Sequence, residues 1–187
     1  MAERDRELAR QIFHMAVGII ALAVLLVLGR GFAMAAVFFT IIIGMMLINS
    51  RMLGRNIGLV QWFEERFERE DAPLPGWGSA AYATGALLAI TFLSDISQIA
   101  AVILILGIGD GLSTIVGRRG RIRIPYNSKK TLEGALALFA SSLASYYFVG
   151  PIALPLAFIA MIAESLPIVD DNISIPVACT AFFLIFT

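Results

Sequence analysis

The stretch ISQIAAVILILGIGDGLSTIV, residues 96–116, decides the fold class of this chain. Its 21 residues include one charged side chain, that of Asp110, and about 20 predominantly apolar residues are enough to cross a bilayer as a helix. Six further runs are likewise continuously apolar rather than alternating, which favours helices over the strands of a membrane barrel. These runs are residues 12–28, 32–48, 79–94, 134–149, 151–167 and 173–187. The sequence therefore predicts an all-α polytopic membrane protein with about seven transmembrane helices in one domain, residues 1–187.

The composition of the whole chain supports this fold class. Of its 187 residues, 59% are apolar and 15% are charged, whereas soluble domains average ~45–50% and ~25%. The mean hydropathy of +0.85 excludes an ordinary soluble domain, a disordered tail and a secreted disulfide scaffold. The single cysteine, Cys179, has no partner for an internal disulfide. Because 14 basic and 14 acidic residues cancel, no overall field points to nucleic acid as a partner.

Basic residues are concentrated on one side of the predicted membrane. Thirteen of the 14 Lys and Arg residues lie in the N-terminal segment and in the loops after the second and fourth runs, and Arg30 is the exception. Thirteen of the 14 carboxylates lie on the same side, with Asp95 as the exception. Since positively charged loops stay in the cytoplasm, we expect a cytoplasmic N-terminus and a site that faces the cytoplasm. A cleavable signal peptide competes for the first run, but the segment before it has no net positive side-chain charge.

Residues 57–70 are typical of a helix that lies on the membrane surface. Phe63 and Phe67 recur at helical spacing on one face, whereas glutamate and arginine side chains fill the other. Two roles are open for this helix: a strut at the interface, or a lid that gates the access of a substrate.

Three ionisable residues lie inside the apolar runs, all in the predicted cytoplasmic half: His14, Asp110 and Glu164. A charge at the centre of a bilayer costs ~2.5–3.5 kcal/mol on insertion scales, so such residues are functional hypotheses. Gly109 and Gly111 remove side chains beside the Asp110 carboxylate, which lets a ligand or a neighbouring helix approach. The alternative is a packing seam of small residues, which explains the glycines but leaves the carboxylate unexplained.

The loop between the fourth and fifth runs is rich in basic residues and leads into a helix. It contains Arg118, Lys129 and Lys130, and Thr131 is a good N-cap for the run that follows. Because free N–H groups at a helix start attract phosphate, these residues form a candidate phosphate site. Plainer roles stay open: the basic residues can serve topology alone, and Glu133 can favour the helix dipole.

Five carboxylates fall at the same membrane face as this basic loop. Oxygen ligands for a divalent cation beside Lys and Arg side chains suit magnesium with a nucleoside triphosphate. Neither a Walker A motif nor G-x-G-x-x-G occurs, so phosphate would be bound outside the familiar soluble folds. One residue of the Asp-Asp-Asn segment at 170–172 is accounted for as a helix cap. The five carboxylates are Asp110, Glu133, Glu164, Asp170 and Asp171.

Four elements of the sequence occur together in one known family. They are Arg10-x-x-x-His14; Gly109-Asp110-Gly111 with Gly117-Arg118; Lys129-Lys130-Thr131-x-Glu133-Gly134; and Glu164 followed by Asp170-Asp171-Asn172 and Pro176. In this order and spacing they resemble the polyprenol kinase family, over about residues 6 to 178. The resemblance implies a multi-span membrane enzyme that transfers a phosphoryl group, typically from CTP, to a lipid alcohol. The alcohol would be a polyprenol or dolichol, a phytol-like alcohol or diacylglycerol. The chain is much shorter than eukaryotic dolichol kinases and resembles a minimal catalytic core.

On this interpretation the candidate residues divide by role. Asp110 is either a Mg²⁺ ligand or the base that accepts the proton of the lipid hydroxyl. His14 either orients the hydroxyl or a phosphate, or makes a structural helix contact. The triphosphate would be held by Arg118, Lys129 and Lys130, at the helix start capped by Thr131. The metal shell would draw on Glu164, Asp170, Asp171 and Glu133 (a further catalytic candidate), with Asn172, Gly109 and Gly111 beside it.

Two other functions stay open. The phosphatidate cytidylyltransferase family, which makes CDP-lipids from CTP, has a stretch similar to residues 127–131. It also carries a C-terminal His-Gly-Gly, whereas the only histidine here is His14. A non-enzymatic transporter of an anionic lipid or a nucleotide would explain charges within the membrane, but its path needs polar groups on both sides. The identity of the lipid and the oligomeric state are left open.

Overall fold

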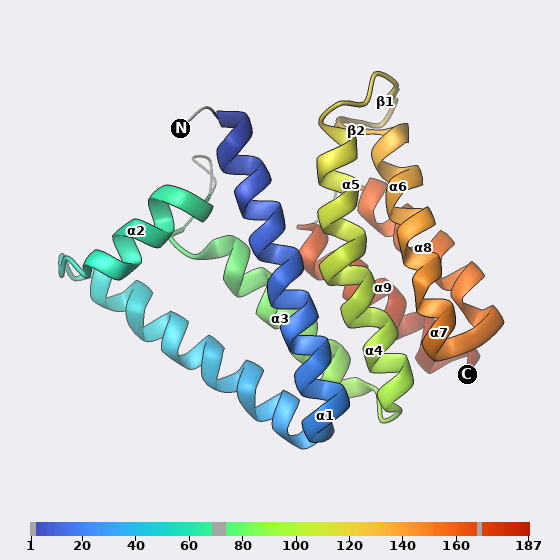
Figure 1. Cartoon of the computed structure of the whole chain (residues 1–187), viewed down its shortest axis with the longest axis horizontal. Coiled ribbons are helices and arrows are strands. Elements are labelled where there is room, and N and C mark those ends of the chain that lie inside the picture. The colour runs from blue at the N-terminus through green and yellow to red at the C-terminus, as the bar shows by residue number, and fades with distance from the viewer. Residues whose placement is uncertain (1–2, 69–73, 168–169) are drawn as a thin grey trace.

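A computed structural model describes residues 3–68, 74–167 and 170–187 of the chain (Figure 1). These residues form a bundle of helices with one short hairpin, which confirms the all-α prediction. The N-terminus and the hairpin lie at the same end of the bundle, and the C-terminus lies toward the other end (Figure 1).

The central helix of the bundle comes from the run that decides the fold class. It consists of α4 (Ile96–Leu104), a π-helical turn η1 (Ile105–Gly109) and α5 (Asp110–Gly117) in continuous succession. Its side chains at Ile99 and Ile103 are completely buried, as the apolar composition of the run requires. The core of the protein is therefore built around this helix.

α1 (Glu3–Met52) consists of two helices that meet at a sharp bend. Gly29 at the bend has φ 82° and ψ 174°, a region of backbone space that essentially only glycine occupies. The guanidinium of Arg30 donates to the carbonyl oxygens of Ile90 and Thr91, at 2.8 and 2.9 Å. The bend thus separates the first two predicted runs, and Arg30 satisfies carbonyl groups at the end of a neighbouring helix.

α2 (Gly58–Phe67) is a helix within the predicted range 57–70, whose last two residues lie outside the described residues. Its position on the membrane surface stays a prediction. Its Phe63 and Phe67 rings pack on Phe13 of α1, with ring centroids 5.3 and 4.7 Å away. The aromatic contacts fix α2 against the first half of α1.

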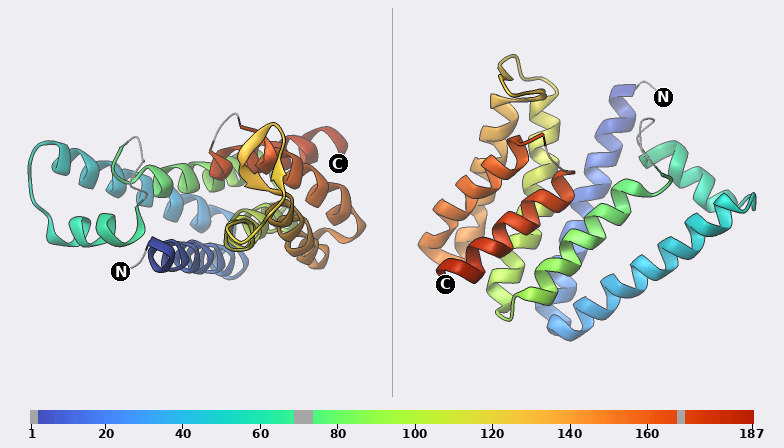
Figure 2. Two further views of the ribbon diagram at one scale, coloured as in Figure 1. Left: turned by 90° about the horizontal axis from the view of Figure 1, so that it is seen from above. Right: turned by 180° about the vertical axis from the view of Figure 1, so that it is seen from behind.

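The remaining helices complete the bundle. α3 (Trp77–Phe92) packs along α9 (Asp171–Phe186) so closely that a side chain at Gly85 would collide with the carbonyl oxygen of Asn172. The chain then runs through α6 (Leu132–Ser142), η2 (Leu143–Ser145), α7 (Tyr146–Val149), η3 (Gly150–Ile152) and α8 (Ala153–Ser165). α6 and α8 lie side by side, and the chain reverses direction between them (Figure 2).

One hairpin stands where the sequence analysis placed only a loop. β1 (Arg123–Ile124) pairs antiparallel with β2 (Asn127–Thr131), and Ile124 lies opposite Asn127. Strands of two and five residues are too short to produce an alternating pattern in the sequence, so the sequence did not predict them. The hairpin matters because β2 carries the lysines of the candidate site.

The helices are consistent with a membrane protein. Among the described residues, three helical stretches are long and apolar enough to cross a membrane: Asp5–Met52, Ile96–Gly117 and Leu132–Ser165. Large apolar side chains remain on the outer surface, among them Val27, which is 79% exposed. In a bilayer such side chains face lipid, which supports the prediction of a membrane protein. The count of seven spans and the cytoplasmic N-terminus stay predictions.

Candidate active site

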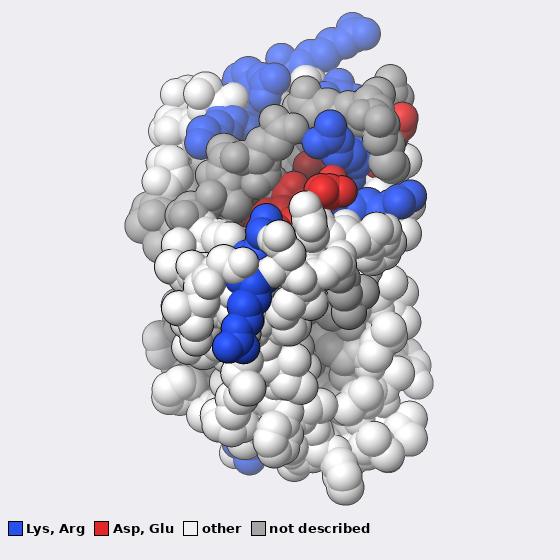
Figure 3. All heavy atoms as spheres, turned by 90° about the vertical axis from the view of Figure 1, so that its left-hand side faces the viewer, with Lys and Arg blue, Asp and Glu red and all other residues white. Residues whose placement is uncertain are grey.

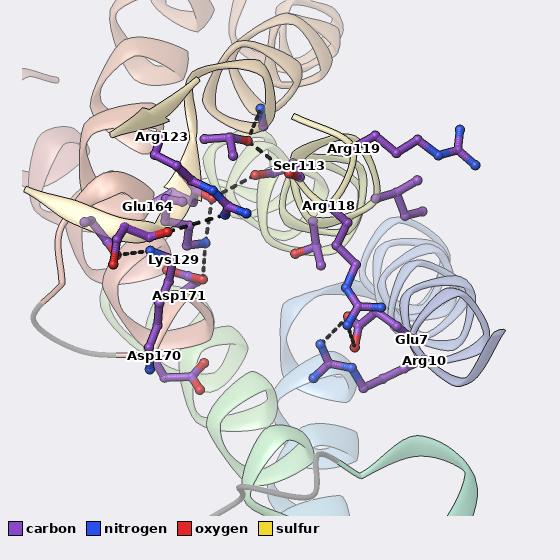
Figure 4. A pocket seen from close by; sticks show the side chains of 18 of the residues that line it. Glu7, Arg10, Ser113, Arg118, Arg119, Arg123, Lys129, Glu164, Asp170 and Asp171 are labelled. Atoms are coloured by element: carbon purple, nitrogen blue, oxygen red, sulfur yellow. Dashed lines mark hydrogen bonds and ion pairs between the residues drawn. The ribbon is translucent and has the colours of Figure 1, made fainter. Parts of the chain in front are cut away.

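An open pocket of about 1960 Å³ lies at the end of the bundle that carries the N-terminus. Its walls come from the start of α1, the ends of α5 and α8, the hairpin and the start of α9 (Figure 4). On the face shown in Figure 3, charged side chains gather toward this end, whereas most of the rest is uncharged. The predicted site residues that line the pocket are Arg118, Lys129, Lys130, Thr131, Glu164, Asp170 and Asp171.

Lys130 makes two short ion pairs in the pocket. Its Nζ lies 2.6 Å from Glu164 Oε1 and 2.5 Å from Asp171 Oδ2. The carboxylates belong to different helices, α8 and α9, so the lysine of β2 joins three elements. Glu164 is only 1% exposed, which makes this a largely buried ion-pair cluster that we call the Lys130 cluster.

Ser113 of α5 completes the Lys130 cluster. Its Oγ donates to Glu164 Oε1 at 2.8 Å, so the same carboxylate oxygen accepts from the serine and from Lys130. Sequence reasoning did not assign this serine a role, because a single hydroxyl in an apolar helix gives no positional signal. The Ser113 hydrogen bond connects the central helix to α8 beside the ion pair.

The local charges keep Lys130 in its charged form. Burial alone lowers the pKa of Lys130, but the carboxylates of Asp171, Glu164 and Asp110 outweigh burial and hold it above its usual value. The ammonium is therefore present throughout the ordinary pH range.

The hairpin is bound to the end of α8. Asn127 is buried, and its Nδ2 donates to the carbonyl oxygen of Ser165 at 3.0 Å. The hydroxyls of Tyr126 and Ser165 are 2.9 Å apart. Because Ser165 directly follows Glu164, these contacts fix β2 beside the carboxylate that Lys130 binds. Sequence reasoning gave neither Tyr126 nor Asn127 a positioning role.

Glu133 lies apart from the Lys130 cluster. Its carboxylate accepts hydrogen bonds from the backbone N–H groups of Arg121 and Ile122, at 2.7 and 3.2 Å, on the exposed side of the loop. Thr131 is the N-cap of α6, as predicted, and accepts from the N–H of Gly134 at 3.2 Å. Both side chains thus hold the loop and the helix start, and in this structure Glu133 does not join the other predicted metal-shell residues.

Asp110 and His14 meet below the pocket rather than along its wall. His14 Nε2 is 3.5 Å from Asp110 Oδ2 and 3.0 Å from the carbonyl oxygen of Leu106. A carbonyl can only accept, so His14 Nε2 carries the proton and donates. The π-helical turn contributes here, because the N–H of Asp110 bonds to Ile105, five residues back. The Asp110 carboxylate beside His14 is buried, at 6% exposed.

The glycines beside Asp110 serve helix packing. A side chain at Gly111 would lie 2.5 Å from Met15 Cγ of α1, and one at Gly109 would lie 3.2 Å from Ser142 Oγ of α6. The sequence left open whether a ligand or a neighbouring helix approaches Asp110 at these glycines. In the structure, neighbouring helices do.

Arg118 projects toward the start of α1. Its Nη2 lies 4.0 Å from Glu7 Oε2, and the other oxygen of Glu7 is bound by Arg10 (Figure 4). Lys129 also lines the pocket, whereas Arg119 points away from the carboxylates in Figure 4. The cationic side chains thus reach the pocket from both the α1 side and the hairpin side.

The predicted metal ligands do not all converge on one point. Asp170 is the N-cap of α9 and accepts from the backbone and side-chain nitrogens of Asn172, at 3.0 and 2.9 Å. Glu164 and Asp171 are engaged by Lys130. Across the part of the chain that the structure describes, no group of three or more His, Cys, Asp or Glu side chains could hold a metal ion. The carboxylates as arranged therefore do not fit a preformed metal centre.

Several curated proteins are similar to this chain. It is 40% identical over 114 residues to the uncharacterized protein MJ1137 of Methanocaldococcus jannaschii, and the alignment covers 58% of this chain and 56% of that protein. It is 39% identical over 98 residues to "Probable phytol kinase 1, chloroplastic" of Glycine max, covering 40% of this chain and 32% of that protein. Farnesol kinase, chloroplastic, of Arabidopsis thaliana is 26% identical over 208 residues, covering 97% of this chain and 66% of that kinase.

The chain is a relative of the phytol and farnesol kinases. These relatives confirm, at modest identity, the resemblance to the polyprenol kinase family that the motifs gave. No family model and no solved structure matches the chain. The chain spans 56%, 32% and 66% of the length of the three relatives, in the order given.

Proposed function

We propose that the chain is a lipid kinase that transfers a phosphoryl group from a nucleoside triphosphate, CTP, to the hydroxyl of a membrane lipid alcohol at the cytoplasmic face. One observation carries this proposal. A lysine held by two carboxylates from different helices lies in an open pocket, edged by arginines, at the end of an apolar helix bundle. The names of the relatives add that proteins similar to this chain act on long-chain alcohols.

The proposal assigns the phosphates to the cationic side chains of the pocket. Lys129 and Lys130 approach from the hairpin, and Arg118 approaches from the end of α5. A guanidinium binds phosphate oxygens in a bidentate manner and an ammonium acts as a point charge, so together they can contact several oxygens of a triphosphate. Phosphoryl transfer relies on such positioning and charge compensation more than on covalent chemistry.

The lipid hydroxyl is assigned to the side of the pocket nearest Asp110. This carboxylate lies at the start of α5, about one helical turn before Ser113, which contacts Glu164 of the Lys130 cluster. It adjoins the apolar part of the central helix, from which a lipid would arrive. His14 Nε2 lies 3.5 Å from this carboxylate, which we assign as the base. It would take the hydroxyl proton as the new P–O bond forms and the bond from the γ-phosphorus to the oxygen of the departing CDP breaks. Magnesium stays part of the proposal: bound with the nucleotide, it would neutralise charge on the phosphate oxygens.

A product assay tests the proposal. The purified full chain is incubated with CTP, ATP, GTP or UTP, each with phytol, farnesol, a polyprenol and diacylglycerol, and the lipids are analysed by mass. We expect a lipid monophosphate, formed with CTP in preference to the other nucleotides. A CDP-lipid would instead identify a cytidylyltransferase. Movement of lipid or nucleotide across vesicles with no product would identify a transporter.

A further inference from the structure

The ammonium of Lys130 lies between two of the carboxylates that the sequence predicts as metal ligands. Its Nζ is 2.6 Å from Glu164 Oε1 and 2.5 Å from Asp171 Oδ2, which are distances of charge-assisted hydrogen bonds. The second oxygen of Glu164, Oε2, is buried and has no hydrogen-bond partner among the described residues. A nearly inaccessible carboxylate with an unused oxygen has capacity for a further cation contact.

The charge balance of the cluster depends on this one lysine. Asp171, Glu164 and Asp110 all act on Lys130 electrostatically. Burying a carboxylate without a cation is costly, so the cluster is stable only with a positive charge among its carboxylates. Removal of the ammonium would leave a cation-sized space lined by carboxylate oxygens.

We propose that Lys130 is the resident cation of this cluster, and that it keeps divalent cations out of the cluster while no nucleotide is bound. Two physical reasons support the exclusion. The ammonium repels a second cation at this range, and Mg²⁺ needs near-octahedral oxygen ligands at ~2.0–2.1 Å, which the engaged carboxylates do not offer. Without the ammonium, Glu164 and Asp171 become available as oxygen ligands, and the space becomes a divalent cation site.

The structure supplies a matched control for this proposal. Lys129 precedes Lys130 on β2 and lines the same pocket, but its side chain is exposed and no ion pair joins it to a carboxylate among the described residues. A change at Lys129 removes the same charge from the hairpin without vacating the cluster.

The test measures Mn²⁺ binding by electron paramagnetic resonance, on the full chain in detergent without nucleotide or lipid. We expect no saturable site in the unchanged chain or in Lys129→Ala. Lys130→Ala should gain one saturable Mn²⁺ site, because a repelling charge is gone. Its Kd should be at least about tenfold lower than that of any residual Mn²⁺ binding by the unchanged chain. Adding Glu164→Gln to Lys130→Ala should abolish that gain.

Two results would overturn the proposal: Mn²⁺ binding by the unchanged chain as tight as by Lys130→Ala, or no gain in Lys130→Ala over Lys129→Ala. If Lys130→Ala does not fold, Mn²⁺ binding by the unchanged chain tests the proposal. A saturable Mn²⁺ site that Glu164→Gln removes would contradict the exclusion of divalent cations from the cluster. Absence of such a site would support the exclusion. The assay contains no substrate, so its outcome is separate from that of the proposed kinase activity.

Discussion

At the scale of single residues, Lys130 is the side chain on which both the stability and the proposed chemistry of the pocket depend. Lys130→Ala leaves the buried Glu164 without its cation, and breaking a buried ion pair on one side typically costs ~3–5 kcal/mol of stability. We therefore expect a lower melting temperature in EDTA, where no metal can replace the ammonium. The nucleotide KM should also rise, or turnover should be lost.

Arg123→Ala is the matched control for Lys130→Ala. Arg123 lies on the same hairpin, but it is exposed and donates only a long hydrogen bond, of 3.4 Å, to the carbonyl of Ser128. Its removal should change melting temperature and KM much less. Small and equal effects of both changes would mean that the basic loop serves topology alone.

Asp110 offers a second residue-scale prediction. Asp110→Asn keeps the size of the side chain and an oxygen near His14 Nε2 but removes the charge. If the carboxylate takes the hydroxyl proton, turnover should fall by ~10²-fold or more. Stability should not fall, because neutralising a buried carboxylate relieves desolvation.

Gly111→Leu tests packing at the same place. Its side chain would collide with Met15 of α1, so this variant should lower the melting temperature. Full activity of Asp110→Asn would show that Asp110 is not the base. Full activity together with a lower melting temperature would mean that Asp110 serves helix packing.

Sequence reasoning reached part of the site at this scale. Intramembrane ionisable residues are costly, so His14, Asp110 and Glu164 were recognisable, and the structure places the first two together. The role of Ser113 and the separation of Glu133 were not predictable. Both follow from which way a side chain projects after the elements have packed, and spacing along the chain does not contain that information.

At the scale of elements, the hairpin β1–β2 presents the lysines to the helices. Asn127→Ala removes the hydrogen bond to Ser165 and leaves a buried carbonyl without this partner, which costs ~1–3 kcal/mol. A misplaced β2 should raise the nucleotide KM by about tenfold, the equivalent of ~1.4 kcal/mol. The measurement is steady-state kinetics with a melting curve on the same preparation.

Tyr126→Phe provides the comparison. It removes only a hydroxyl contact at the edge of the hairpin, where Tyr126 is 60% exposed, so its KM should stay near that of the unchanged chain. If Asn127→Ala lowers the melting temperature without moving KM, the hairpin contributes to stability alone.

The elements themselves were predictable to different degrees. The apolar runs predict the helices well, because burial in lipid or core imposes long apolar stretches. The bend at Gly29 also has a cause in the sequence, since the glycines at 29 and 31 lie between two apolar runs. The π-helical turn before Asp110 and the hairpin have no such pattern. They occur beside tertiary contacts, such as the hydrogen bond from His14 to Leu106, which no pattern along the chain encodes.

At the scale of the whole molecule, the orientation in the membrane decides which compartment supplies the nucleotide. The native Cys179 is completely buried, so single introduced cysteines can be labelled selectively. Ser94→Cys, between α3 and α4, should react with an impermeant maleimide on sealed cells. Ser128→Cys, on the hairpin, should react only after permeabilisation. Labelling of position 128 from outside would contradict the predicted cytoplasmic site.

The central claim is that the pocket transfers the terminal phosphoryl group of CTP to a lipid alcohol. The most direct measurement compares CTP labelled with ³²P at the γ-phosphate and at the α-phosphate, using the purified chain and phytol or farnesol. We expect the lipid product to carry the γ label and none of the α label, and Lys130→Ala to abolish the transfer. Lipid product carrying the α label, or unchanged transfer by Lys130→Ala, would contradict the proposed kinase reaction.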